Sequence, residues 1–551
     1  TDKMAMVTDS PSTQCIHHSP LKRFAPRNHN ISLQKTCDAL GDGVTPLSAA
    51  TPPSENDHLV VVSRIIINRR DTKKDRRRMA EVASMRVDYD HESLSHDPIH
   101  GYIPFVSRRG ISTHEVSEQD LIDHPWIQRL RQIHQLQTAW WVFPSATHTR
   151  FQHVLGVMHL AGRIANQLYP TLAASDPNSP SRGYVVSLMR VAGLLHDVGH
   201  GPFGHFFDQF YLARHHLNHE LLGAEIIRRE LAPLIRRIRR NPVAQLEAHE
   251  ELEPEHVCFL ITRPRGGCDG TAPLWLRLLR GLFSGIYTVD NMDFVLRDAY
   301  MSGYSQKAFD LERLIHYSFF TPHGVTIHER GLSALVRFIT VRAELFRSIY
   351  FHRTVRSIDL SLQDLFRESA ELLFPGNPLL FLGEYRRFTD WSLLVDVERW
   401  ADSSEEQKVA LGLQWREWLA RKIRWKMVCE RTIFFGPGKA EEMSVFSDEH
   451  LFEEAVRRRL PPDLREIPLR FDPPRHVHRP GTRAPAAGQN FLYDPAQNVV
   501  RSLDARELYR QIPLSYRICR VYALDVDHAS EIAAAMDSLL SEDLVDDVTN
   551  M

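Results

Sequence analysis

Apolar residues recur at helical spacing through the middle of the chain. From Leu121 to about Phe366 the pattern is mainly helical, with one apolar residue every three or four positions. The run from Val185 to Leu195 is apolar nearly all round, which is typical of a helix enclosed by other helices. Gly and Pro residues at 177–180, 201–202 and 266–270 predict loops between these helices. The central part of the chain is therefore predicted to be a helical bundle.

The pattern changes beyond Trp400. Charged residues from Glu405 to Lys426 predict a solvent-facing helix, and the Pro-rich stretch from Pro461 to Pro485 predicts a linker. The alternating run from Ile518 to Leu524 predicts a strand, and Ala529 to Leu540 predict a helix. We therefore expect a smaller α+β lobe at the C-terminal end.

The first 84 residues have a different composition. Ser, Thr, Pro and Asn dominate up to Asp57, and a charged run from Arg69 to Arg78 follows a short apolar stretch. A segment of this kind buries too little apolar surface to fold alone, so residues 1–84 are predicted to be a disordered tail. A basic tail can contact nucleic acid, but a solvated charge run is the preferred interpretation. Globular patterning begins near Met85.

Bulk composition excludes several classes of protein. The chain has 551 residues, of which 43% are hydrophobic and 25% charged, and a net charge of −2. These values are typical of a globular protein, and they indicate no general attraction to nucleic acid or to an acidic membrane. Six cysteines without a CxxC pair indicate a reducing compartment. With neither a long apolar span nor a basic-then-apolar start, the expectation is a cytoplasmic protein with no membrane segment.

The segment from Leu194 to His205 carries the strongest chemical signal. His196 and Asp197 end an apolar helix and offer a nitrogen and an oxygen to one divalent cation. Two further ligands are expected from His153, 43 residues before His196, and from Asp290, 93 residues after Asp197. A lone His-Asp pair usually has no function, but the glycine-rich continuation and the two outlying residues favour a metal site. Such a metal would activate water and polarise a phosphoryl oxygen.

Further polar residues follow the doublet closely. His200, His205, Asp208 and His219 all fall within 23 residues of His196. A histidine paired with a carboxylate can stay protonated and give a proton to a leaving oxygen. Each histidine alone is as readily structural, but the group together favours a role beside the metal.

Two arginines are candidates for holding phosphate. Arg150 is expected one turn before His153. Arg342, Phe346 and Tyr350 are expected on one helix face, where they fit either a nucleotide site or an ordinary interface stripe.

The order His…His-Asp…Asp resembles that of HD-domain phosphohydrolases. The wider match is similar to the sterile-alpha-motif/HD deoxynucleoside triphosphate triphosphohydrolases and their bacterial relatives. The segments that carry it are Asp97 to Gly101, Gln128 to Arg131, Gln135-Leu136, Val142 to Pro144, His148 to Gly156, Leu194 to Asp208, His219-Glu220, Asp290 to Asp298 and Ile512 to Val521. The resemblance implies a mainly α fold, with an HD helical bundle over residues 85–390. A helical extension and α+β lobe would follow over 391–551.

The resemblance also implies roles for individual residues. His153, His196, Asp197 and Asp290 match metal ligands, and Arg150 and Arg342 match phosphate-binding arginines. His200, His205 and His219 match active-site histidines, and Asp208 matches their carboxylate partner. Gln135, Leu136 and Asp298 match sugar contacts, and Tyr350 matches the tyrosine that crowds the ribose 2′ position.

Asp123, Gln128 and Arg131 match residues that read guanine at an allosteric nucleotide site between subunits. The same residues also fit an ordinary charged helix. The resemblance thus implies a nucleotide activator and a homo-oligomer, either a dimer or a tetramer.

Four positions depart from the family pattern. Asn291 replaces a phosphate-binding lysine, Phe294 a tyrosine near the sugar, Phe346 a histidine and Phe351 a glutamine near the base. Each change removes a polar contact to substrate, which broadens or moves specificity.

The expected activity is metal-dependent hydrolysis of deoxynucleoside triphosphates to the deoxynucleoside and inorganic triphosphate. One alternative is hydrolysis of another nucleotide or phosphoester at the same centre. A second is a nucleotide sensor or nucleic-acid-binding module built on the same scaffold. A His/Asp site accepts Mn, Fe, Mg, Ni or Zn, so the residues leave the metal open.

Overall fold

A computed structural model describes residues 91–262, 271–435, 446, 448–473, 490–503 and 515–545. All of these residues belong to one compact unit, Asp88–Met551. The predictions for residues 1–84 and for the loop at 266–270 lie outside the described residues.

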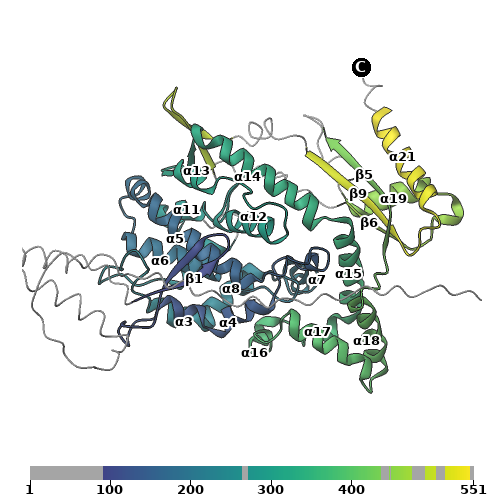
Figure 1. Ribbon diagram of the computed structural model, residues 1–551, viewed down its shortest axis with the longest axis horizontal. Coiled ribbons are helices and arrows are strands. Elements are labelled where there is room, and N and C mark those ends of the chain that lie inside the picture. The colour runs from purple at the N-terminus through teal and green to yellow at the C-terminus, as the bar shows by residue number, and fades with distance from the viewer. Residues whose placement is uncertain are drawn as a thin grey trace, which may run out of the picture. The chain divides into compact units, whose positions relative to one another are not determined.

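Long helices form the centre of the fold (Figure 1). They are α5 (Arg150–Ser175), α6 (Arg182–Leu195), α12 (Val289–Met301), α14 (Leu332–Leu345) and α15 (Arg353–Leu373). Helix α5 packs against both α6 and α12. Every residue of α6 from Gly183 to Leu195 is buried, as the all-apolar pattern predicts. The mainly α fold class is therefore confirmed.

Further helices surround this centre. They are α3 (Glu118–Ile122), α4 (Pro125–Gln128), α7 (His205–Phe210), α8 (His219–Ile226), α9 (Ala232–Arg236), α10 (Pro254–Ile261), α11 (Leu274–Arg280), α13 (Leu311–His316), α16 (Leu382–Tyr385), α17 (Asp390–Arg399) and α18 (Glu406–Leu419). A π-helical turn, Phe346–Tyr350, continues α14, and His352 caps the start of α15. A single apolar core runs through most of these elements.

Within the described residues, strands form three small sheets. β1 (Glu92–Asp97) pairs antiparallel with β2 (Gly101–Val106). β3 (Ser318–Thr321), β4 (Gly324–His328), β7 (Asn490–Asp494) and β8 (Val499–Ser502) form the second sheet, in which β4 and β7 are parallel. β5 (Lys426–Phe435), β9 (Ser515–Ala523) and β6 (Leu469–Asp472) form the third, which is antiparallel.

The third sheet belongs to a smaller C-terminal α+β region, as expected. Helices α19 (Glu449–Arg459) and α21 (Ala529–Val545) contact each other and share a separate apolar core with this sheet. β9 covers most of the predicted strand, and α21 contains the predicted helix. The prediction of a linker over 461–485 was wrong at Leu469–Asp472, because these residues pair with β9. The strand has only 4 residues, and the prolines on either side of it are more typical of a loop.

Ion pairs join this lobe to the helical bundle, among them that of Arg470 on β6 with Asp364 on α15. Arg356 on α15 donates to Asp472 on β6, with Nη2–Oδ1 at 2.8 Å. Among the described residues, none of the helices is long and apolar enough to cross a membrane.

Candidate metal centre

His153 lies in the first turn of α5. Thr149 and Gln152 form a capping box that fixes where this helix begins, and His153 follows within one turn. Its side chain is 1% exposed, and its Nδ1 lies 2.8 Å from Asp293 Oδ2. That contact places the proton on Nδ1 and turns Nε2 toward the end of α6.

His196 and Asp197 follow directly after α6. His196 Nδ1 donates to the carbonyl oxygen of Gly193 at 2.8 Å, so Nε2 is the nitrogen with a free electron pair. That Nε2 is buried, and it has no hydrogen-bond partner among the described residues. A buried nitrogen without a partner costs free energy, and a metal ion at this position would remove the cost.

Asp290 reaches the same point from α12, whose first turn is capped by the Thr288 side chain. Its Oδ1 lies 3.1 Å from His153 Nε2 and 3.7 Å from His196 Nε2. Asp197 Oδ1 lies 3.3 Å from His196 Nε2. The structure thus brings together the four residues that the sequence singled out. Ligand atoms of His153, His196 and Asp197 lie close enough to share one ion, and Asp290 is 37% exposed at its edge.

The electrostatics of the centre also suit a cation. Burial by itself lowers the pKa of His153, but hydrogen bonds to Asp290 and Asp293 overcome this and raise the pKa to about 10. The site therefore holds positive charge readily. A divalent cation would take the place of that proton, because a metal-bound imidazole must be neutral on its ligating nitrogen.

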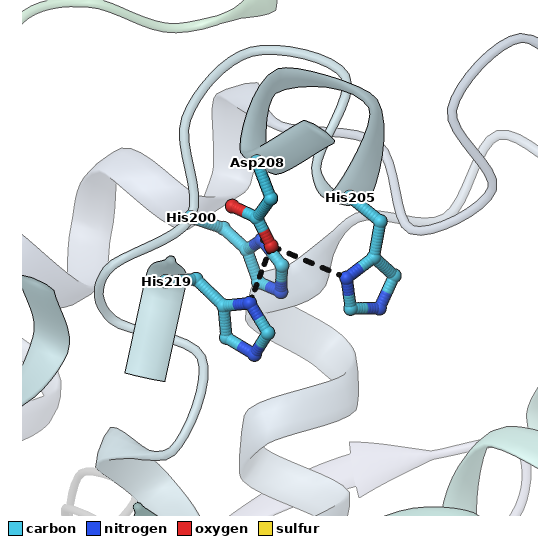
Figure 2. A group of neighbouring side chains, drawn as sticks. All are labelled: His200, His205, Asp208 and His219. Atoms are coloured by element: carbon cyan, nitrogen blue, oxygen red, sulfur yellow. Dashed lines mark hydrogen bonds and ion pairs between the residues drawn. The ribbon is translucent and has the colours of Figure 1, made fainter. Parts of the chain in front are cut away.

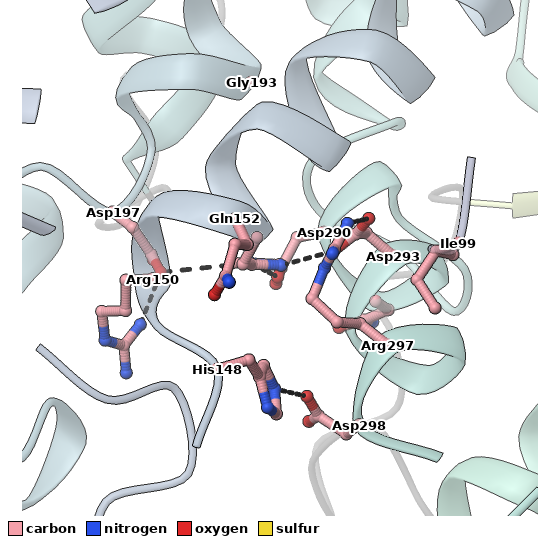
Figure 3. Close-up of polar contacts among 12 residues, drawn as sticks. Ile99, His148, Arg150, Gln152, Gly193, Asp197, Asp290, Asp293, Arg297 and Asp298 are labelled. Atoms are coloured by element: carbon pink, nitrogen blue, oxygen red, sulfur yellow. Dashed lines mark hydrogen bonds and ion pairs between the residues drawn. The ribbon is translucent and has the colours of Figure 1, made fainter. Parts of the chain in front are cut away.

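Asp293, three residues after Asp290, lies beside it on α12 (Figure 3) and contacts His153. Its side chain is 0% exposed, and it accepts from His100 Nε2 at 2.7 Å as well as from His153. Arg297 donates to both of its oxygens at 2.9 Å and to Asp97 Oδ2 at 2.8 Å. Asp293 is not among the residues predicted from the sequence to form the site. A sequence signal for Asp293 does exist, because its spacing from Asp290 and Arg297 places all three residues on one face of a helix.

A second polar cluster lies just beyond the doublet, and Figure 2 shows its members (His200, His205, Asp208 and His219) around one carboxylate. Asp208 Oδ2 lies 2.5 Å from His219 Nδ1, 3.4 Å from His205 Nδ1 and 3.7 Å from His200 Nδ1. The rings of His200 and His219 stack with their centroids 3.8 Å apart. The predicted catalytic residues therefore do lie together.

Two of these histidines, His200 and His219, differ in their proton affinity. Burial, with Arg150 and His219 nearby, lowers the pKa of His200 well below its usual value. Burial opposes the charged form of His219 as well, but Asp208 more than offsets this and raises the pKa of His219. His219 is thus more readily protonated than His200, because Asp208 stabilises its charged form. His205 has a side chain that is 67% exposed and so accessible to a ligand.

Arg150 is buried beside the centre. Its Nη1 lies 2.5 Å from Asp197 Oδ2, an ion pair that also appears in Figure 3. Gly204 makes room for this guanidinium, because a Cβ there would lie 2.3 Å from Arg150 Nη2. Gly204 also has a φ of 55°, which favours glycine. The loop after His200 is therefore shaped around Arg150.

An additional buried cation, Arg129, holds the same loop in place. Its guanidinium donates to the carbonyl oxygens of Val198, His200, Tyr385 and Phe388, with the shortest bonds at 2.7 Å. Asp390 reinforces the contact by accepting from the backbone of Phe203 at 2.7 Å. The roles of Arg129 and Asp390 could not be predicted from the sequence, because carbonyl partners leave no pattern in the sequence.

The candidate sugar contacts lie around Asp298. Its Oδ1 lies 2.7 Å from His148 Nε2, and its Oδ2 accepts from the Tyr350 hydroxyl at 2.6 Å. Gln135 has a buried Oε1 without a hydrogen-bond partner among the described residues, and Leu136 beside it is buried. The π-helical turn at Phe346–Tyr350 brings Tyr350 to Asp298.

The positions that depart from the family pattern are largely aromatic. The Phe346 ring contacts those of Tyr350 and Phe351, with centroids 4.8 and 5.7 Å away, and the Arg342 guanidinium lies 5.9 Å from the Phe346 centroid. Phe294 packs against the main core, and the backbone N–H of Asn291 is capped by Thr288. Aromatic packing thus occupies the places where the family pattern has polar side chains.

Of the three candidate allosteric residues, Gln128 and Arg131 contact each other. Arg131 Nε donates to Gln128 Oε1 at 2.8 Å, and its guanidinium lies 3.5 Å from the centroid of the Phe151 ring. Asp123 pairs instead with Arg108 at 3.2 Å. Phe151 directly follows Arg150, so Arg131 contacts the helix that carries the metal centre.

Comparison with known proteins agrees with this arrangement of a helical bundle around a His/Asp centre. Residues 150–260 match the HD domain. The chain therefore carries an HD domain, and this domain supplies His153, His196 and Asp197. HD domains bind divalent metals, which fits the geometry of these side chains.

Relatives extend the match beyond the HD domain. The chain is 26% identical over 381 residues to the Bacillus subtilis protein YwfO, covering 66% of this chain and 77% of YwfO. It is 31% identical over 309 residues to the deoxynucleoside triphosphate triphosphohydrolase SAMHD1 of Bos taurus, covering 51% and 48%. The Homo sapiens SAMHD1 is 28% identical over 315 residues, covering 52% and 46%. This chain thus spans about half the length of these triphosphohydrolases.

A solved structure shares the fold. It is a hypothetical protein from Aquifex aeolicus, with a TM-score of 0.57 and 23% sequence identity, covering 81% of this chain and 100% of that one. At that identity the likeness shows the fold alone.

Proposed function

We propose that this protein is a metal-dependent phosphohydrolase that converts deoxynucleoside triphosphates to the deoxynucleoside and inorganic triphosphate. The observation that carries the proposal is the position of the His219–Asp208 pair. His219 stacks on His200, and His200 Nε2 lies 3.4 Å from Asp197 of the His/Asp centre. The resemblance to deoxynucleoside triphosphate triphosphohydrolases supports the choice of substrate.

In this proposal His153, His196, Asp197 and Asp290 hold the divalent cation. When bound, that cation lowers the pKa of water and polarises a phosphoryl oxygen. Arg150 lies against Asp197 and would bind a phosphate oxygen next to the centre. His219, kept protonated by Asp208, would give its proton to the departing 5′ oxygen.

Tyr350 and Asp298 would select the sugar. The hydrogen bond between them at 2.6 Å holds the tyrosine ring in one position. A ring held in this way would crowd a ribose 2′-hydroxyl, whereas a deoxyribose would fit. Removing the ring by Tyr350→Ala should therefore admit ribonucleoside triphosphates.

The proposal is tested by incubating the purified protein with each dNTP, NTP and nucleoside monophosphate, in Mn²⁺ or Mg²⁺. Inorganic triphosphate and free deoxynucleoside are the expected products. His219→Gln should lower kcat by about 100-fold or more, since general acid catalysis contributes about 10²–10⁴-fold. His249→Gln is the matched control, because His249 lies on the surface with a side chain that is 79% exposed. Release of orthophosphate from monophosphates alone would refute the proposed substrate.

We also propose the assembly and the boundaries that the sequence suggests. Residues 85–390 form the HD part of the chain, and residues 391–551 the extension and lobe. Asp123, Gln128 and Arg131 bind an activating nucleotide at a subunit interface, and the contact of Arg131 with Phe151 on α5 would link that nucleotide to the helix that carries His153. Sedimentation with and without a guanine nucleotide tests this, because the proposal requires dimer or tetramer formation that Arg131→Ala weakens.

A further inference from the structure

A cavity lies beside the catalytic histidine cluster, on the side of His205. Its volume is about 160 Å³, and its lining includes Gln137, Phe206 and Phe210 from the HD part, together with Asp359 on α15 and Asp472 on β6. Ligand sites for whole small molecules are usually about 300–1,000 Å³. This cavity is therefore suited to one part of a ligand, such as a single ring system.

Gln137 combines two unusual features. Its backbone has a φ of 49°, a left-handed conformation that residues with side chains rarely adopt. Its side-chain Oε1 is buried and has no hydrogen-bond partner among the described residues. Strained backbone and unpaired buried polar atoms both cost free energy, and they concentrate at functional sites. Gln137 thus presents an unused acceptor at the cavity.

The charges of the lining indicate which part of a ligand would enter. Asp359, Glu449 and Asp472 supply carboxylates, and Arg356 supplies the guanidinium. Arg356 is already bonded to Asp472 Oδ1 at 2.8 Å and to Asp359 Oδ2 at 3.2 Å. An acidic lining repels phosphate, so a triphosphate would lie on the other side of His205, near Arg150. The uncharged end of a nucleotide remains as the part that fits.

We propose that this cavity receives the nucleobase of the substrate, and that Gln137 selects bases that present an amino group to its Oε1. The inference rests on the proposed function and specifies how that site chooses among its substrates. Adenine, cytosine and guanine carry an exocyclic amino group. Thymine has no amino group, and its one base N–H donor, at N3, lies between two carbonyl oxygens that would face the Gln137 Oε1 unfavourably. The rings of Phe206 and Phe210 provide flat apolar surfaces against which a base can stack. The substrate class is therefore a deoxynucleoside triphosphate with an amino-bearing base.

The variant Gln137→Gly tests the proposal without threatening the fold, because glycine adopts this φ without strain. Loss of one hydrogen bond of about 1–1.5 kcal/mol should lower kcat/KM for dATP, dCTP and dGTP about tenfold. The kcat/KM for dTTP should stay within about twofold. Arg421→Gly is the matched control, because Arg421 is exposed, has a φ of 59° and lies outside the cavity lining. An equal effect of Gln137→Gly on all four substrates, or none, would overturn the proposal.

Binding of phosphate-free deoxynucleosides, measured by calorimetry, separates this inference from the proposed function. The wild-type protein should bind deoxyadenosine and deoxycytidine more tightly than thymidine, and Gln137→Gly should abolish the difference. If that pattern appears while no dNTP is hydrolysed, the cavity assignment stands and the proposed reaction fails. If dNTPs are hydrolysed but the two proteins bind the three deoxynucleosides alike, the reaction stands and the cavity assignment fails.

Discussion

Asp293 is the residue on which the candidate metal centre depends most strongly without contacting the ion. It accepts hydrogen bonds from His100, His153 and Arg297, and it is fully buried. The change Asp293→Asn keeps the size of the side chain but removes its charge. It also replaces one acceptor oxygen with an NH₂ group that faces donors. The perturbation is therefore electrostatic rather than steric.

The expected loss is large for both stability and metal binding. Removing one partner of a buried ion pair costs about 3–5 kcal/mol, because the other charge stays buried without compensation. His153 would also lose the contact that directs its Nε2 to the metal, and losses of this kind weaken metal affinity by about 10–100-fold. The variant should thus unfold at lower temperature and bind Mn²⁺ at least about tenfold more weakly.

Calorimetric titration of Mn²⁺ into the folded variant measures the affinity, and circular dichroism during heating measures the stability. Glu312→Gln is the matched control, since it also neutralises a carboxylate paired with an arginine but is 74% exposed. The control should change the free energy of unfolding by less than about 1 kcal/mol and leave Mn²⁺ affinity unchanged. A folded Asp293→Asn protein with wild-type Mn²⁺ affinity would show that the reasoning about His153 is wrong.

Further predictions concern packing, loop position and pH. Gly156→Ala would place a Cβ 2.0 Å from Asp293 Oδ1, so the protein should lose about 1–3 kcal/mol of stability or more and melt at a lower temperature. An unchanged melting temperature would contradict the close packing of α5 and α12. In Arg129→Lys, the single ammonium group cannot bond all four carbonyl oxygens that Arg129 contacts. The kcat should therefore drop about tenfold or more while Mn²⁺ affinity is retained. A wild-type kcat would count against a role of Arg129 in positioning His200. Burial raises the pKa of Asp359 in the folded protein to about 6, although Arg356 acts to lower it. The folded state therefore binds this proton more tightly than the unfolded state does, and the resulting stabilisation is complete below about pH 3.8, the usual pKa of the group. That contribution, up to about 3 kcal/mol at about 1.4 kcal/mol per unit, is lost as pH rises through about 6. Denaturant unfolding should therefore show that Asp359→Asn gains stability relative to wild type as the pH rises from 4 to 7. If the free energies of unfolding of the two proteins change in parallel with pH, the raised pKa of Asp359 is excluded.

Local patterns in the sequence predicted the elements that depend on local information. The all-apolar run before His196 predicted a buried helix, and the structure places α6 there. The alternating run near Val521 predicted β9. The strand at Leu469–Asp472 was missed because it is short and follows prolines, and its pairing partner lies in β9, some 50 residues further along the chain. Short strands are determined by their partners as much as by their own residues.

The sequence alone determined which side chains could hold a metal. A His-Asp doublet after a buried helix, with His153 before it and Asp290 after it, has the ligand chemistry of a divalent cation whatever the fold. Tertiary structure decided how those ligands are oriented, since the contact of His153 with Asp293 joins residues 140 positions apart. It also decided the position of the loop at His200, because Arg129 bonds carbonyl oxygens up to 259 positions away. Every residue has such a carbonyl, so no sequence pattern identifies which ones a buried arginine will meet.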